Sequence, residues 1–134
     1  MLKIALCDDN EMQQDILMDQ VSDYVKEKGI EAEITLFSNG NELLDHVKEN
    51  GGFDIYVLDM IMPGLKGIDL GAELRNMGDK GHIIYLTITN AFISKAVEVQ
   101  ASIYLLKPIT KSQLANVLDN VITQIDEKKT GEGK

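Results

Sequence analysis

Acidic residues follow two short apolar runs in this sequence. Residues 2–6 form the first run, which passes through Cys7 into Asp8 and Asp9, and residues 55–58 form the second, which ends at Asp59. Such runs are typical of buried parallel strands, whose carboxyl ends would bring the three carboxylates to one edge of a sheet. Carboxylates held close together repel one another, and a hard divalent cation with oxygen ligands relieves that repulsion. The sequence therefore predicts a Mg²⁺ site suited to phosphoryl transfer.

Two more polar side chains stand where apolar runs end. Thr87 closes the run 83–87, and Lys107 follows the run 103–106. Because Pro108 favours an extended conformation for the residue before it, the Lys107 ammonium group should point off the edge of the sheet. Each feature alone has an ordinary structural explanation, since Thr favours strands and acids favour helix starts. Together they would supply a cation site, a nucleophile, a hydroxyl donor and a fixed positive charge.

The elements that must position these residues alternate between strand and helix five times. The strand patterns cover residues 2–6, 34–37, 55–58, 83–87 and 103–106. Five such units without hairpin signals predict an α/β fold, a doubly wound flavodoxin-like (βα)5 sandwich around a parallel sheet. In the strand order 2-1-3-4-5, the first and third strands are neighbours, and ligands bind where the order reverses.

Helical periodicity fills the segments between these strands. The first helix has an apolar stripe that closes before Gly29, a common C-terminal signal, and consists of Met12, Ile16, Leu17, Val21, Tyr24 and Val25. The last helix begins at Thr110, where Gln113 predicts a capping box. We expect one domain over residues 1–126, followed by a flexible tail or the start of a linker at 127–134.

The composition restricts the partners and the compartment. The chain has 134 residues, a formal net charge of −9, no Trp and 44% hydrophobic residues. A single domain this acidic should bind neither nucleic acid nor anionic membranes, and no apolar run is long enough to span a bilayer. A lone cysteine, Cys7, permits no internal disulfide, which fits a reducing, cytoplasmic location.

These motifs resemble a known family over about residues 2–125. They comprise a doubled acid after the first strand, Asp59 followed by Met-Pro and the nearby Gly67, Thr87 after the fourth strand, and Lys107-Pro108 after the fifth. The set resembles the response regulator receiver domain, the CheY-like family. Three segments narrow the resemblance to receivers that precede LytTR-type DNA-binding domains: Cys-Asp-Asp-Asn, Met-Pro-Gly-Leu-Lys-Gly-Ile-Asp-Leu and Tyr-Leu-Leu-Lys-Pro-Ile.

The resemblance implies a phosphoacceptor site. Asp59 would take a phosphoryl group from a sensor histidine kinase and form an aspartyl phosphate. Asp9, Asp59 and the Ile61 carbonyl would bind Mg²⁺ directly, and Asp8 would bind it through water. The domain would be a signalling module that catalyses only its own phosphorylation and dephosphorylation, rather than an enzyme.

The same resemblance implies a conformational switch. Lys107 and Thr87 would each contact a phosphoryl oxygen, and Tyr104 would turn inward as Thr87 moves. The fourth helix, the fifth strand and the fifth helix would then form a surface for an effector domain or for self-association. Ile88, which follows Thr87, departs from the small residue that the family favours, and we expect it to narrow the approach to Asp59.

Other functions fit the sequence less well. A phosphatase of the haloacid dehalogenase type carries a second acid two residues after its nucleophile, where this chain has Ile61. An FMN site would place a phosphate against Asp8 and Asp9, which repel it. A pseudo-receiver that is never phosphorylated is disfavoured because every site position is filled. With no DNA-binding segment after the last helix, we expect either a stand-alone receiver or the first part of a longer transcriptional regulator.

Overall fold

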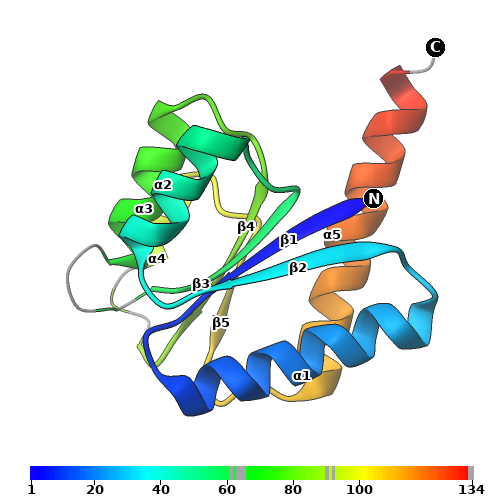
Figure 1. Cartoon of the computed structure of the whole chain (residues 1–134), viewed down its shortest axis with the longest axis horizontal. Coiled ribbons are helices and arrows are strands. Elements are labelled where there is room, and N and C mark those ends of the chain that lie inside the picture. Colours follow the sequence, from blue (N-terminus) through cyan, green and yellow to red (C-terminus); the bar gives the residue numbers. More distant parts are fainter. Residues whose placement is uncertain (61, 63–65, 90, 92, 133–134) are drawn as a thin grey trace.

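Five parallel strands form one sheet at the centre of the computed structural model, which describes residues 1–60, 62, 66–89, 91 and 93–132 (Figure 1). The strands are β1 (Leu2–Cys7), β2 (Ala32–Phe37), β3 (Ile55–Asp59), β4 (His82–Thr87) and β5 (Ile103–Leu106). Their order in the sheet is β2-β1-β3-β4-β5, all parallel. The prediction of a doubly wound sandwich with this strand order is confirmed.

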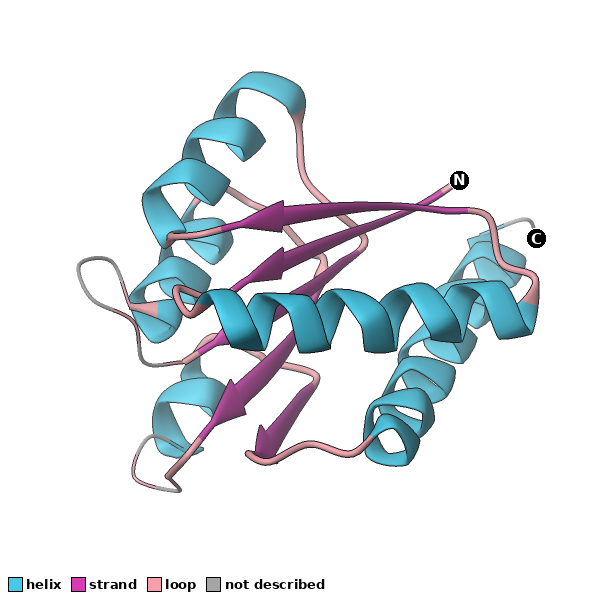
Figure 2. Ribbon diagram, turned by 60° about the horizontal axis from the view of Figure 1, so that its bottom comes forward, coloured by secondary structure: helices cyan, strands magenta, loops and turns pink. Residues whose placement is uncertain are grey.

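The helices cover both faces of the sheet. They are α1 (Glu11–Lys28), α2 (Gly40–Asn50), α3 (Gly67–Asn76), α4 (Ile93–Glu98) and α5 (Lys111–Glu132). Figure 2 shows α1 running across one face of the sheet. The apolar residues of α1 and α5 pack in one core with alternate strand residues, and those of α2, α3 and α4 pack in the other. Because both faces of the sheet are covered, β3 is buried along its whole length, which explains its unbroken apolar pattern.

Local hydrogen bonds fix the helix ends that the sequence predicts. Gly29 closes α1 in the left-handed region, with a φ of 65°. At the start of α5, the Gln113 N–H donates to the Thr110 hydroxyl at 3.1 Å, and the Thr110 N–H donates to the Gln113 side chain at 2.9 Å. The predicted capping box is therefore confirmed.

One expectation about α1 is wrong. Met12 and Ile16 are exposed on α1, whereas Gln14 is buried in their place. Its side-chain amide donates to the Asp8 carbonyl at 2.7 Å, so a hydrogen bond rather than apolar character explains this burial. At the other end of the chain, α5 continues to Glu132 and so includes part of the segment 127–134.

Among the helices of the described residues, none has an apolar stretch long enough to cross a membrane.

Candidate functional site

The three acids predicted from the strand ends meet at one edge of the sheet. β1 and β3 are neighbours, with Cys7 paired to Leu58, so Asp8 and Asp59 leave the two strands side by side. One carboxylate oxygen from each of Asp8, Asp9 and Asp59 lies within 4.8 Å of the other two. The predicted convergence is confirmed.

Two of the three carboxylates in this cluster are buried, so their negative charge must be balanced by nearby positive charge. Asp8 and Asp59 are buried and Asp9 is exposed. The Lys107 ammonium lies 3.3 Å from an oxygen of Asp8 and 3.7 Å from an oxygen of Asp59, and it balances one of the three negative charges. Partly buried carboxylates that retain net negative charge and offer oxygen ligands fit a hard divalent cation such as Mg²⁺. The expected ligand from the Ile61 carbonyl lies outside the described residues.

Lys107 reaches the acids from the position directly after β5. Its backbone N–H donates to the Thr87 carbonyl at 2.7 Å, which joins the ends of β4 and β5. Its side chain is mostly buried and extends back over the edge of the sheet to the carboxylates. The Lys107–Pro108 peptide is cis. The positive charge is carried by the first residue after β5, and the bond to Thr87 ties its backbone to the end of β4.

Thr87 and Tyr104 are connected through Thr89, a residue that the sequence pattern did not single out. Thr87 is buried, and its hydroxyl accepts a long hydrogen bond of 3.4 Å from the Thr89 N–H. The Tyr104 hydroxyl donates to the Thr89 carbonyl. Desolvation raises the pKa of Tyr104, which keeps the hydroxyl protonated as a donor. One residue of the loop after β4 therefore bonds to both predicted switch residues.

Behind the acids, the backbone is tightly packed. Gly67 at the start of α3 lies so close to β3 that an added Cβ would stand 2.0 Å from the Asp59 carbonyl oxygen. Cys7 is buried here, and burial, followed by the charges of Asp8 and Asp59, raises its pKa to about 12. The thiol therefore stays protonated, and its sulfur lies 3.9 Å from that of Met62. Cys7 acts as a core residue.

The structure does not support the expected role of Ile88. Its side chain is 78% exposed, so it forms no packed cover over Asp59. It lines an open groove of about 340 Å³ beside α1, together with Gln13, Ile16, Lys107, Pro108 and Ile109.

The fold and the site together define a class of protein: a five-stranded CheY-like receiver with an acidic cluster at the carboxyl ends of β1 and β3. The family model of the response regulator receiver domain matches residues 4–119. The chain belongs to this family and is a receiver domain of a two-component system.

Two curated relatives are similar to the chain over most of the receiver. Sensory transduction protein LytR of Staphylococcus epidermidis is 33% identical over 97 residues, which are 72% of this chain and 38% of that protein. Sensory transduction protein LytT of Oceanobacillus iheyensis is 32% identical over 98 residues, 72% of this chain and 39% of that protein. The narrower resemblance to LytR- and LytT-type receivers is confirmed. The chain matches well under half the length of either relative.

Solved structures agree on the fold. The response regulatory domain of MrkE from Klebsiella pneumoniae superimposes with a TM-score of 0.83 at 24% identity, covering 94% of this chain and 99% of that one. A response regulator receiver domain protein from Clostridium thermocellum superimposes with a TM-score of 0.77 at 25% identity, covering 94% and 98%. Both neighbours cover nearly the whole chain.

Proposed function

We propose that Asp59 is the phosphoacceptor of this receiver and that a sensor histidine kinase is the donor. The observation that carries the proposal is the cluster of Asp8, Asp9 and Asp59 facing the Lys107 ammonium. An oxygen of the Asp59 carboxylate would form a bond to phosphorus as the bond from phosphorus to the kinase histidine breaks. The product is an aspartyl phosphate, and the domain acts as a phosphoacceptor signalling module rather than as an enzyme with a separate substrate.

Mg²⁺ and Lys107 would each offset part of the negative charge on the phosphoryl oxygens. Mg²⁺ held by Asp8, Asp9 and Asp59 would neutralise charge on the phosphoryl oxygens. Lys107 already lies within 4 Å of two carboxylates, so its ammonium can exchange a carboxylate oxygen for a phosphoryl oxygen with little movement. Its position on the sheet keeps the charge in place without reorganisation.

The hydrogen bonds around Thr89 suggest how phosphorylation changes the conformation. The Thr87 hydroxyl accepts a long bond from the Thr89 N–H and would donate its own proton to a phosphoryl oxygen, and its movement toward that oxygen would stretch or break the bond from Thr89. The loop after β4 would then shift, and Tyr104 would follow through its bond to the Thr89 carbonyl. The phosphoryl group thereby favours one of two arrangements of this loop, which a switch requires.

Replacing Thr87 by Ala is expected to separate chemistry from switching. Phosphorylation should continue at a rate within roughly threefold of wild type, because Thr87 is neither the nucleophile nor a metal ligand. The amide chemical-shift response of α4 and β5 to beryllofluoride, a phosphoryl mimic, should fall to roughly half or less. Thr87→Ser keeps the hydroxyl and should restore the response, whereas Lys107→Ala should weaken both steps. An undiminished response in Thr87→Ala would contradict this role of the hydroxyl.

The surface over α4 and β5 supports an output role. Ile93 and Val97 on α4 are 52% and 74% exposed, and Leu106 at the end of β5 is also exposed. Exposed apolar side chains on these two elements favour contact with an effector domain or a second copy of the receiver. Since longer relatives include sensory transduction and transcriptional regulatory proteins, we propose control of transcription through a LytTR-type domain.

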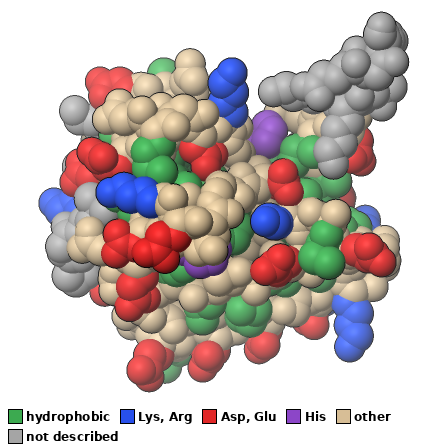
Figure 3. Space-filling view, turned by 45° about the horizontal axis from the view of Figure 1, so that its top comes forward, with side chains coloured by type: hydrophobic (Ala, Val, Ile, Leu, Met, Phe, Trp, Pro, Cys, Tyr) green, Lys and Arg blue, Asp and Glu red, His purple; other side chains and the backbone are tan. Residues whose placement is uncertain are grey.

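The charge distribution supports a partner other than nucleic acid. Figure 3 shows Asp and Glu side chains scattered over the face in view, in keeping with the net charge of −9. Direct binding to nucleic acid or to anionic membranes would meet electrostatic repulsion. We propose a cytoplasmic location, where the kinase would meet the domain and the thiol of Cys7 would stay reduced.

A mass measurement tests the phosphoacceptor proposal. Incubation with acetyl phosphate or phosphoramidate should add one phosphoryl group to the intact protein when Mg²⁺ is present. EDTA should suppress the gain, because the carboxylate cluster then lacks the cation that offsets its charge. A gain of equal rate and extent in excess EDTA would contradict the metal dependence.

A further inference from the structure

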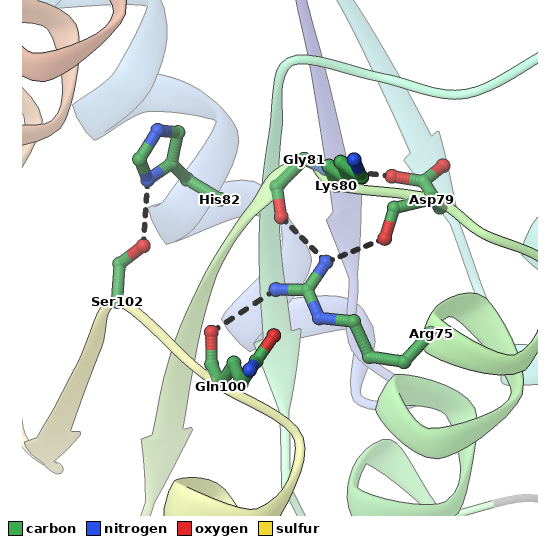
Figure 4. Close-up of a pocket in the computed structure, with 7 residues that line it drawn as sticks. All are labelled: Arg75, Asp79, Lys80, Gly81, His82, Gln100 and Ser102. Atoms are coloured by element: carbon green, nitrogen blue, oxygen red, sulfur yellow. Dashed lines mark hydrogen bonds between the residues drawn. The ribbon is translucent and has the colours of Figure 1, made fainter.

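Arg75 near the end of α3 donates four hydrogen bonds to backbone carbonyls of described residues, and Figure 4 shows the three to Asp79, Gly81 and Gln100. Its Nε donates to Val99 at 2.7 Å, and its Nη2 donates to Gln100 at 3.1 Å. Its Nη1 donates to Asp79 and to Gly81, both at 2.9 Å. A planar guanidinium with several N–H donors can hold carbonyls from different segments in one arrangement, which a lysine ammonium cannot reproduce.

These bonds join the end of α4 to the start of β4. Gly81 directly precedes β4, whereas Val99 and Gln100 directly follow α4. The last carbonyls of a helix lack partners within it, and here the side chain of another helix supplies partners for the carbonyls just beyond that end. Gln100 also has a positive φ of 56°, a conformation that non-glycine residues rarely adopt. The hydrogen bond from Arg75 to its carbonyl helps to hold the backbone in that conformation.

The C-terminal end of α4 is held by burial and by backbone hydrogen bonds. At its C-terminal end, Ala96 and Val99 are buried, and the N–H groups of Gln100 and Ala101 donate to carbonyls of α4, each at 3.0 Å. At its N-terminal end, Ile93 is exposed. The loop before α4 contains Thr89, which Tyr104 contacts from β5. One end of α4 is therefore fixed to the body of the domain, and the other is next to the switch residues.

We propose that Arg75 is a positioning residue that makes the C-terminal end of α4 a fixed pivot. On activation, the N-terminal end of α4 moves with the Thr89 loop while residues 99–102 keep their place. Arg75 lies at the opposite end of β4 from the acids, since it bonds Gly81 before that strand, whereas Asp59 pairs with Leu86 near its end. Arg75 therefore influences the direction in which α4 moves and does not take part in the phosphorylation of Asp59. The movement itself rests on the proposed function.

Hydrogen exchange in the unphosphorylated protein tests the anchor independently of any phosphorylation. Arg75→Lys keeps the charge but loses the fork of donors, so exchange at the amides of Gln100, Ala101 and Ser102 should accelerate roughly tenfold. Amides of β1 should change far less. Lys80→Gln is the matched control, because Lys80 lines the same pocket of about 280 Å³ and its replacement removes a positive charge while leaving the fork intact. Wild-type exchange at these amides in Arg75→Lys would overturn the proposal.

Amide chemical shifts with and without beryllofluoride test the pivot. In wild type, the changes should be large at Thr89 and from Ile93 to Val97, and small from Val99 to Ser102. In Arg75→Lys, the changes should spread into Val99–Ser102, while the rate of phosphorylation by phosphoramidate stays at the wild-type level. A purely structural role would lower stability without altering this distribution. Equal changes at both ends of α4 in wild type, or a wild-type distribution in Arg75→Lys, would overturn the pivot.

The two proposals fail in different ways. If beryllofluoride and phosphoramidate leave wild type unchanged, the proposed function is wrong, and with it the pivot. The exchange experiment on the unphosphorylated protein still decides whether Arg75 holds this end of α4.

Discussion

Asp59→Asn is expected to reduce phosphorylation by about 100-fold or more, to the limit of detection by intact mass. The carboxylate oxygen that would bond to phosphorus becomes part of a neutral amide, which is a poor nucleophile. The substitution also removes one of the three charges that would attract Mg²⁺ to the cluster. Phosphoramidate with Mg²⁺ is the appropriate donor, because a small molecule removes any dependence on kinase docking.

Asp9→Asn provides the matched control for Asp59→Asn. It removes the same charge from the same cluster but keeps the proposed nucleophile, so slow phosphorylation should remain and should map to Asp59. Circular dichroism should show that both variants stay folded, since each lowers the repulsion among neighbouring carboxylates. A phosphoryl group that still attaches to Asp59→Asn at the wild-type rate would assign the acceptor to another residue.

The acidic cluster could be predicted because parallel-sheet geometry constrains it strongly. Once residues 2–6 and 55–58 are interpreted as neighbouring strands, their carboxyl ends must meet at one edge, and so must Asp8 and Asp59. Thr87 and Lys107 follow from the same rule applied to β4 and β5. The sequence pattern therefore locates the carboxyl ends of the strands, and the site consists of the polar side chains at those ends.

Contacts between side chains and backbone carbonyls could not be predicted in the same way. Arg75 bonds four carbonyls, and Thr89 offers its carbonyl to Tyr104. Every residue has a backbone carbonyl, so the residue types and their spacing do not indicate which carbonyl a side chain will contact. Gln14 illustrates the related failure in α1, where a hydrogen bond to the Asp8 carbonyl places a polar residue in a position that periodicity assigned to apolar ones. Tertiary partners override the local pattern at these positions.

Gly67→Ala is expected to lower the free energy of unfolding by about 3 kcal/mol and to slow phosphorylation of Asp59. The new Cβ would lie 2.0 Å from the Asp59 carbonyl oxygen and 2.8 Å from the Met60 Cα, and both are backbone atoms. They cannot move aside freely, because the Met60 N–H donates to the Leu86 carbonyl of β4 at 2.9 Å. Relief must therefore come from displacing α3 or the end of β3, which carries Asp59. Urea unfolding and the rate of mass gain measure the two effects.

Gly71→Ala is the control that shows whether the effect of Gly67→Ala comes from displacement of Asp59 or from overpacking of α3 in general. An added Cβ at Gly71 would also stand 2.0 Å from a neighbour, but that neighbour is the buried Tyr85 hydroxyl, which donates to the Gly67 carbonyl at 2.9 Å, so relief moves a side chain and weakens one hydrogen bond rather than displacing the backbone of β3. Ala also favours a helix interior over Gly by about 1 kcal/mol, which offsets part of the cost. We therefore expect Gly71→Ala to be less destabilising than Gly67→Ala and to be phosphorylated at the wild-type rate. If the two variants lose equal stability and both keep that rate, the close approach of α3 to β3 does not position Asp59. If the rate falls only in Gly67→Ala, the close packing that Gly67 allows between α3 and β3 fixes the position of Asp59.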